Sequence, residues 1–168
     1  MSRRFSLFLS SLAILLASAG ILYLLSGAPQ RDITGAAEAI DGDSLRLAGE
    51  EMRLKGIDAP EFSQTCQVAR QTVDCGRESR AALRKLLRSG LVTCIGGERD
   101  RFGRLLVSCR VRGVDINAAM VRDGQAMAFG GYDQEEAEAK AAFRGLWAGE
   151  FERPQDWRRR HRNDAPQR

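Results

Sequence analysis

Three short clusters of charged residues combine carboxylates with arginines at the ends of segments that alternate apolar and polar residues. They are DGDS at 41–44, RLKGIDAPE at 53–61 and DRFGR at 100–104. Carboxylates can hold a hard metal ion, and the planar fork of arginine binds two phosphate oxygens at once. Each cluster alone is typical of an ordinary turn, loop or hairpin tip. Together they indicate a site that binds a metal ion and a phosphate group.

Histidine-based and zinc-based chemistry are disfavoured by the residues that the sequence lacks. The single histidine, His161, lies near the C-terminus, so a two-histidine nuclease site cannot be built. No pair of cysteines has the C-x₂-C spacing of a zinc site. For phosphodiester hydrolysis, the composition therefore leaves a mechanism based on carboxylates, a metal ion and arginines as the main route.

The hydrophobic pattern predicts an α+β domain, mainly β, that forms a small barrel with about three helices packed on it. Short segments alternate apolar and polar residues, and others repeat apolar residues at helical spacing. The segment 61–76 has neither period and is expected to be a loop. The expected strands are 33–40, 44–47, 52–54, 91–95, 105–111, 114–116 and 125–129, and the expected helices are 77–88, 117–123 and 134–144.

The segments 44–47 and 52–54 are expected to form a hairpin whose arginines point away from the core. Side chains alternate between the two faces of a strand, so Arg46 and Arg53 must project from the face opposite the apolar residues. The residues on the buried face are Leu45, Leu47, Met52 and Leu54.

The four cysteines predict export and two disulfides. An even number of cysteines suits an oxidising compartment, where disulfides persist. A bridge between Cys66 and Cys75 would close the loop at 61–76.

The second bridge is expected between neighbouring strands. If Asp100 and Gly103 flank a two-residue turn, Cys94 and Cys109 lie opposite each other across the hairpin. Opposed residues of this kind have Cα atoms roughly 4.5 Å apart, just inside the range of a disulfide. The alternative, for a cytosolic protein, is a pair of buried thiols.

The N-terminus carries a targeting element. Arg3 and Arg4 precede an almost uncharged apolar stretch from Phe5 to Leu25, and such a pattern directs export of the chain behind it. The stretch has about the length of a bilayer span, roughly 20 residues. Residues 1–28 are therefore expected to be a membrane anchor or a cleaved signal peptide.

The rest of the chain is expected to lie outside the cytoplasm, either anchored to the inner membrane with its domain in the periplasm or extracellular, or secreted after cleavage. Residues 29–157 form the predicted folded domain, and the arginine-rich residues 158–168 form a predicted mobile tail. The formal net charge of +4 permits a polyanionic partner without requiring one.

Several segments, taken in order, resemble the staphylococcal nuclease (thermonuclease) family. The likeness runs from about Ile40 to Trp157 and rests on the segments IDGDSLRL, MRLKGIDAPE, DRFGRLLVSC and INAAMVRDGQA. The resemblance implies an OB-fold, a five-stranded Greek-key barrel with helices, which agrees with the order of the expected elements.

The resemblance implies roles for the acidic residues. Asp43 and Asp58 match the carboxylates that bind Ca²⁺, and the carbonyl of Ala59 matches a further ligand. Glu61 matches the carboxylate that orients or deprotonates the attacking water. Two carboxylates, a carbonyl and water form an oxygen-ligand set that suits Ca²⁺.

The resemblance also implies the contacts to substrate. Arg53 and Arg104 match the arginines that bind the scissile phosphate, and Arg101, Phe102 and Tyr132 are expected to contact the nucleic acid. The sequence departs from the family where Phe102 replaces a tyrosine, and Tyr132 is the one evident residue for stacking on a base. Stacking contributes roughly 1–3 kcal/mol per base, so substrate affinity or preference is expected to differ.

The function implied by the resemblance is calcium-dependent hydrolysis of single-stranded or denatured DNA and RNA by a monomeric endonuclease that leaves 3′-phosphate ends. One alternative is an OB-fold module that binds nucleic acid or an envelope partner without catalysis. The other is an extracytoplasmic protein for stability or assembly. The complete set of charged residues favours the enzyme.

Overall fold

A computed structural model describes residues 29–161 of the 168-residue chain. The predictions for residues 1–28 and for the end of the tail, 162–168, lie outside this range. The strands are β1 (Arg31–Gly35), β2 (Ala37–Ala39), β3 (Ser44–Leu47), β4 (Glu50–Leu54), β5 (Ile57–Asp58), β6 (Cys66–Val68), β7 (Gln71–Val73), β8 (Val92–Arg99), β9 (Leu105–Val111), β10 (Val114–Asp115) and β11 (Met127–Ala128). The helices are α2 (Cys75–Leu87), α3 (Ile116–Arg122), α4 (Asp133–Ala141), a 3₁₀ turn at Gly145–Ala148 and α5 (Pro154–Arg160).

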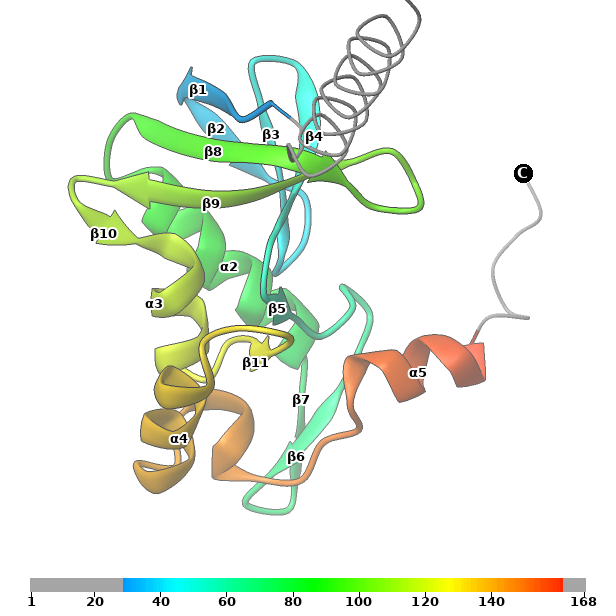
Figure 1. The fold of residues 1–168 in the computed structure, drawn as a ribbon. Coiled ribbons are helices and arrows are strands. Elements are labelled where there is room, and N and C mark those ends of the chain that lie inside the picture. The colour runs from blue at the N-terminus through cyan, green and yellow to red at the C-terminus, as the bar shows by residue number, and fades with distance from the viewer. Residues whose placement is uncertain (1–28, 162–168) are drawn as a thin grey trace, which may run out of the picture.

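In the described part of the chain, the main sheet has seven strands and curls round into a barrel (Figure 1). The strand predicted at 33–40 is bent at Ala36 into β1 and β2, which pair with different neighbours: β1 with β8, and β2 with β3. The ring continues from β3 to β4, from β4 to β9 in parallel, and from β9 to β8. The predicted OB-fold, in an α+β and mainly β chain, is confirmed.

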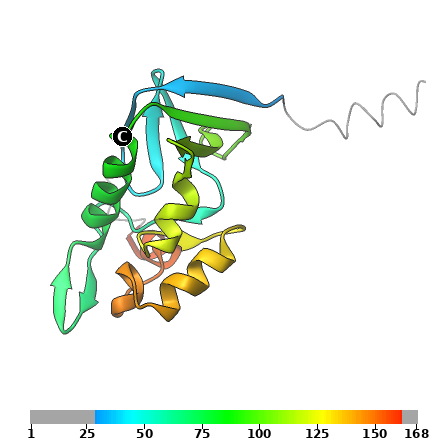
Figure 2. The same cartoon turned by 90° about the vertical axis from the view of Figure 1, so that its left-hand side faces the viewer.

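Alternating side chains of the first hairpin build the barrel core, as predicted. Leu45, Leu47, Met52 and Leu54 are fully buried, whereas Arg46 is exposed. The helix α2 lies against the barrel and inserts Leu83 and Leu87 into the same core (Figure 2). Because Met52 and Leu54 on either side of it point into the core, Arg53 projects from the outer face of β4.

The β8–β9 hairpin confirms the predicted disulfide but corrects the predicted turn. Cys94 lies opposite Cys109, with Cα atoms 4.1 Å apart, and the two are bridged. At the tip, however, the amide of Asp100 donates to the carbonyl of Arg104, so the turn contains three residues rather than two. A bulge between Gly96 and Arg99 shifts the register by one residue, and this shift compensates for the longer turn.

The expected loop at 61–76 contains a small hairpin instead. Strands β6 and β7 pair with each other, and the hairpin projects from the body beside α2 (Figure 2). Its turn places Ala69 and Arg70 at positive φ, a conformation that neither residue type favours. The predicted Cys66–Cys75 disulfide is present and joins β6 to the start of α2.

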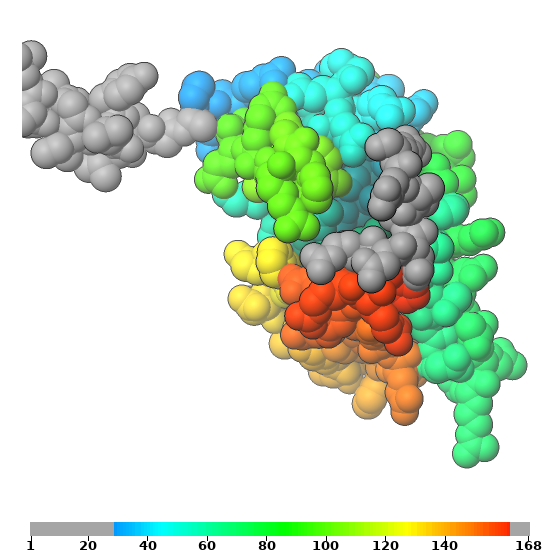
Figure 3. All heavy atoms as spheres, turned by 90° about the vertical axis from the view of Figure 1, so that its right-hand side faces the viewer, coloured from blue at the N-terminus to red at the C-terminus, as the bar shows by residue number. Residues whose placement is uncertain are grey.

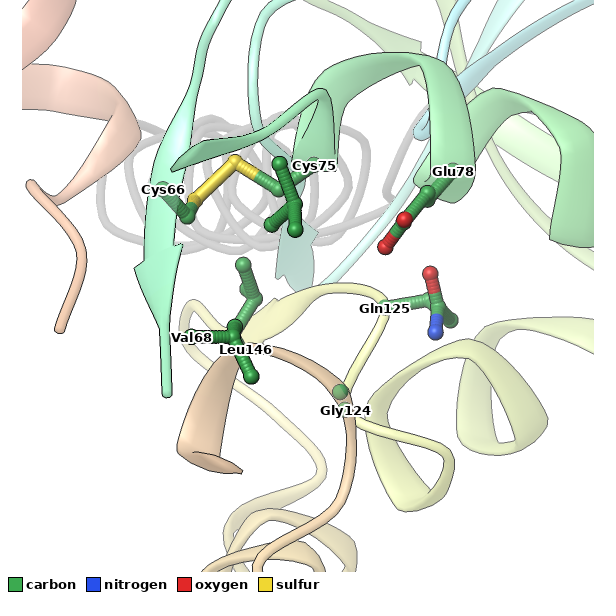
Figure 4. Close-up of a pocket in the computed structure, with 9 residues that line it drawn as sticks. Cys66, Val68, Cys75, Glu78, Gly124, Gln125 and Leu146 are labelled. Carbon is green, nitrogen blue, oxygen red and sulfur yellow. A yellow bond between two sulfur atoms is a disulfide. The ribbon is translucent and has the colours of Figure 1, made fainter. Parts of the chain in front are cut away.

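This disulfide belongs to a second, smaller apolar cluster (Figure 4). Cys66, Cys75, Met127 and Leu146 form the buried part of that cluster. A small pocket opens beside it, and its polar side chains, Glu78 and Gln125, lie on the side opposite the disulfide. None of the residues predicted for catalysis, metal binding or substrate binding lines this pocket.

The predicted basic tail starts as ordered structure. Residues 154–160 form helix α5, so the predicted boundary at 157 between the domain and a mobile tail is wrong for residues 158–160. Pro154 at the first turn and three arginines in the last turn suit such a helix. Between residues 29 and 161, no helix has the length and apolar character needed to cross a membrane.

Candidate active site

Asp43 is held almost without exposure to solvent at the turn between β2 and β3. The carboxylate of Asp41 accepts hydrogen bonds from the amides of Asp43 and Ser44, at 3.0 and 2.7 Å, and so fixes the turn. Gly42 allows the turn to approach α2 closely, because a Cβ at this position would lie 2.0 Å from the hydroxyl oxygen of Ser79. The carboxylate of Asp43 then accepts a hydrogen bond from the amide of Ala59 at 3.0 Å.

One guanidinium nitrogen joins the two predicted metal carboxylates. Nη2 of Arg53 lies 2.7 Å from Oδ2 of Asp43 and 2.8 Å from Oδ1 of Asp58. Arg53 reaches them because its position on β4 pairs with Ser44, next to Asp43. Asp58 is buried on β5, whose backbone pairs with Met127 of β11. The fold thus brings together residues from three separate segments.

The donor chemistry of this pair fits Ca²⁺. Both carboxylates converge on one positively charged atom, and Ca²⁺ takes carboxylate, carbonyl and water oxygens. Within residues 29–161, no group of three or more histidine, cysteine or acidic side chains forms a complete metal cage, so water or substrate would have to supply further oxygens. The peptide of Ala59 lies beside the pair through its amide; the role of its carbonyl stays a prediction.

Burial makes the ionised form of Asp43 unfavourable. It raises the pKa of this carboxyl from 3.8 to about 7, and the nearby charges of Asp41 and Asp58 act in the same direction. Arg53 and the hydrogen bond from Ala59 oppose the shift only in part. A divalent cation at the pair would favour the ionised form.

In calcium-free solution, the contribution of Asp43 to the free energy of unfolding is expected to decrease as the pH rises from 3.8 to about 7. In this window native Asp43 keeps a proton that the unfolded chain has released, so raising the pH favours the unfolded state. Asp43→Asn removes this contribution, and its stability relative to the wild type should rise across the window. Urea unfolding in EDTA at several pH values measures this difference in the free energy of unfolding between variant and wild type. Asp32→Asn, a substitution at an exposed position, is the control. Parallel pH profiles for wild type and Asp43→Asn would contradict the shift.

Arg104 is fixed beside the pair by the hairpin turn. Its Nε and Nη2 each lie 2.8 Å from Oδ2 of Asp100. The other carboxylate oxygen of Asp100, Oδ1, accepts hydrogen bonds from the backbone amides of Phe102 and Arg104. Its Nη1 lies 3.3 Å from the hydroxyl of Ser44, which in turn donates to Asp43 at 3.1 Å. A short hydrogen-bonded chain therefore links Arg104 to the carboxylates.

The predicted aromatic contacts lie in two different places. Phe102 is exposed at the hairpin tip, with the guanidiniums of Arg101 and Arg104 at 4.7 and 5.5 Å from its ring centre. Tyr132 lies against Gly56, where a Cβ would be 2.9 Å from the ring. Burial raises the pKa of Tyr132, and none of the charged groups that influence it is one of the five predicted charged site residues. The substrate contacts of all three residues stay predictions.

Glu61 lies at the edge of the site and contacts a residue predicted to lie in the mobile tail. Arg158 of α5 donates to Oε1 of Glu61 at 2.7 Å and to Oδ2 of Asp58 at 3.0 Å. The start signals of α5, a proline at its first position and an acidic residue in the first turn, could have predicted the helix. They could not have predicted which surface it covers.

Comparison with known proteins places strands β4 to β11 and helices α2 to α4 within one family. A protein-family model described as "Staphylococcal nuclease homologue" matches residues 51–149. Asp43 and Arg158 lie outside that matched range.

Individual relatives support the same grouping. The chain is 36% identical over 128 residues to a succinoglycan biosynthesis protein, ExoI, of Rhizobium meliloti, covering 71% of this chain and 67% of the relative. It is 32% identical over 143 residues to an uncharacterized endonuclease of Escherichia coli, covering 78% and 87%. It is 40% identical over 128 residues to a probable staphylococcal-like nuclease, CAN3, of Oryza sativa, covering 72% of this chain but only 32% of the rice protein.

Proposed function

Since the chain belongs to the staphylococcal nuclease family, we propose that it is a calcium-dependent endonuclease that hydrolyses single-stranded or denatured DNA and RNA. The observation that carries the proposal is the convergence of Asp43 and Asp58 on Arg53, with Arg104 linked to them through Ser44. The relatives named as nucleases and endonucleases support the reaction class.

Asp43, Asp58 and the carbonyl of Ala59 would hold the metal ion. Bound there, Ca²⁺ would supply positive charge to a phosphoryl oxygen and help to orient the attacking water. Asp43 is positioned by the Ala59 amide and Arg53, and Asp58 by Arg53 and Arg158. These fixed partners keep the carboxylate oxygens in place before substrate arrives, and such preorganisation favours the transition state.

The remaining charged residues divide the chemistry between proton transfer and phosphate binding. Glu61 takes a proton from the attacking water as general base. Arg53 and Arg104 bind the non-bridging oxygens, where negative charge accumulates in the transition state. Asp100 holds the guanidinium of Arg104 through Nε and Nη2, so Nη1, which contacts Ser44, is the nitrogen that would turn to a phosphate. Attack by the water oxygen breaks the bond between phosphorus and the 5′-oxygen, and that oxygen takes up a proton from solvent, so cleavage leaves a 3′-phosphate and a 5′-hydroxyl.

The substrate surface extends from the charged residues to the hairpin tip. Exposed Phe102, with Arg101 beside it, offers a ring face and positive charge to a base and its phosphate. A single strand presents unstacked bases to such a surface, and a duplex does not. The proposal therefore includes preference for single-stranded nucleic acid without selectivity for the sugar.

The proposal for the cell compartment rests on the sequence of residues 1–28. We propose a monomeric protein that is anchored by residues 1–28, or secreted after their cleavage, and acts outside the cytoplasm. The two disulfides support an oxidising compartment.

The test is incubation of the full chain, purified in detergent, with denatured DNA, RNA and duplex DNA in the presence of calcium. Denatured DNA and RNA should be degraded, and duplex DNA more slowly. The fragments should accept a radioactive phosphate at their 5′-hydroxyl ends from a kinase without prior dephosphorylation. Salt-sensitive binding without degradation would instead support the non-catalytic OB-fold module.

A further inference from the structure

Helix α5 brings a guanidinium into the candidate active site from the far end of the chain. Arg158 donates from Nη1 to Glu61 and from Nη2 to Asp58, at 2.7 and 3.0 Å. A guanidinium is rigid and planar, so these two bonds fix the separation and relative orientation of the carboxylates. One of them is the proposed general base, and the other is a proposed calcium ligand.

The loop that carries Glu61 and the segment that carries Arg158 are tied to the same buried glutamine. The side chain of Gln64 accepts a hydrogen bond from the amide of Glu61 at 3.2 Å and donates to the carbonyl of Glu152 at 2.7 Å. The same two segments are also joined through their backbones, because Gln67 and Glu150 exchange two hydrogen bonds, both 2.8 Å long. Figure 3 shows α5, in red, packed against the body of the molecule below the barrel strands.

The charge of Arg158 is well compensated in this position. Burial disfavours its charged form, but hydrogen bonds and charge attraction from Asp58 and Glu61 outweigh this and raise the pKa of Arg158. Its side chain is 34% exposed and that of Glu61 is 31% exposed, so both remain accessible to water. Two nitrogens held in one rigid plane each contact a different carboxylate, and the single nitrogen of lysine cannot reproduce this geometry.

Among residues 29–161, only one oxygen of the Glu61 carboxylate has a hydrogen-bond partner. Arg158 contacts Oε1, whereas Oε2 accepts no hydrogen bond from any residue that the structure describes. Engagement of one oxygen orients Glu61 and leaves the other oxygen for the proton of the attacking water.

Resting on the proposed nuclease function, we propose that Arg158 is a positioning residue of the active site. It holds Glu61 at a fixed place relative to Asp58, so that Oε2 faces the water that attacks the phosphate bound by Arg53 and Arg104. Arg158 acts through these carboxylates. A displacement of about 1 Å in such an arrangement can lower a rate by about 10²-fold.

The test compares Arg158→Gln and Arg158→Lys with wild type in the full chain, purified in detergent. Arg159→Gln is the matched control, because Arg159 is a mostly exposed neighbour whose ion pair is with Asp156 of the same helix. Three quantities are measured: kcat and KM on a single-stranded oligonucleotide at saturating calcium, the calcium Kd by calorimetry without substrate, and the Tm.

Arg158→Gln should lower kcat by about 10–100-fold with little change in KM, because the geometry of Glu61 is lost while the phosphate-binding arginines remain. The same variant should bind calcium more tightly, since a positive charge beside Asp58 has been removed. Arg158→Lys should return the calcium Kd towards the wild-type value but leave kcat low, because it restores the charge without the fork. Arg159→Gln should match the wild type.

Unchanged or increased kcat in Arg158→Gln would overturn the inference, and an increase would identify α5 as an inhibitory element. Weaker calcium binding together with a large fall in Tm would overturn it as well, because Arg158 would then serve only to keep the site folded. In both cases wild-type cleavage leaves the proposed function intact. If the wild type itself does not cleave with calcium, both proposals fail.

Discussion

Glu61→Gln is expected to lower kcat on single-stranded DNA by roughly 10²–10⁴-fold, the range for loss of a general base. Glutamine keeps the size of the side chain and can still accept a hydrogen bond from Arg158, but its amide cannot take the proton of the attacking water. The calcium Kd and the KM should change little, because Asp43, Asp58 and the arginines are untouched. Single-turnover cleavage at saturating calcium measures the chemical step.

The matched control is Glu98→Gln, an exposed glutamate on β8 whose partner is Lys55. It should cleave at the wild-type rate. A Glu61→Gln enzyme that retained more than about a tenth of the wild-type kcat would remove Glu61 from proton transfer, since a general base contributes at least about 10²-fold.

Arg104→Lys is expected to lower kcat by roughly 10²–10³-fold, comparable to the loss of one donor that stabilises charge in a transition state. Arg104 has two functions that lysine cannot perform together: it binds Asp100 through Nε and Nη2, and it presents Nη1 towards Ser44 and the carboxylates. Lysine retains the charge but is a single-point donor. The loss should therefore appear mainly in kcat, with a smaller rise in KM.

Arg110→Lys provides the comparison for this variant, since Arg110 is an exposed arginine on β9, the strand that follows Arg104, and it likewise lies beside an acidic residue, Asp115. It should retain wild-type kinetics. Equal activities of Arg104→Lys and wild type would show that charge alone is sufficient at this position, and would contradict the role given to the guanidinium fork.

Much of the barrel could be predicted from the sequence because its signals are local. Alternation within 44–47 and 52–54 decides which side chains enter the core, and it forces Arg53 to the outer face. The Cys94–Cys109 pairing was predicted correctly although the turn was not. One extra turn residue and one bulge residue cancel, and no local signal distinguishes this combination from a regular two-residue turn.

The features that escaped prediction depend on contacts between distant segments. Strands β6 and β7 have three residues each, and of these six residues only Cys66 is buried. The Cys66–Cys75 disulfide and the pairing of Gln67 with Glu150 hold the two strands in place. Arg158 lies 100 residues from Asp58 in the sequence. Helical spacing can predict that 154–160 forms a helix, but the surface on which it packs is set by Gln64 and the segment before the helix.

The most direct test of the account is the rate of cleavage of a single-stranded oligonucleotide as a function of free calcium, measured with the full chain in detergent. We predict no measurable rate in EDTA, a saturable increase as calcium is added, and full recovery when calcium is restored after chelation. Asp58→Asn should require far more calcium, because one of the two carboxylate ligands is lost. A wild-type rate that is the same in EDTA and in calcium, or no cleavage at any calcium concentration, would contradict the account.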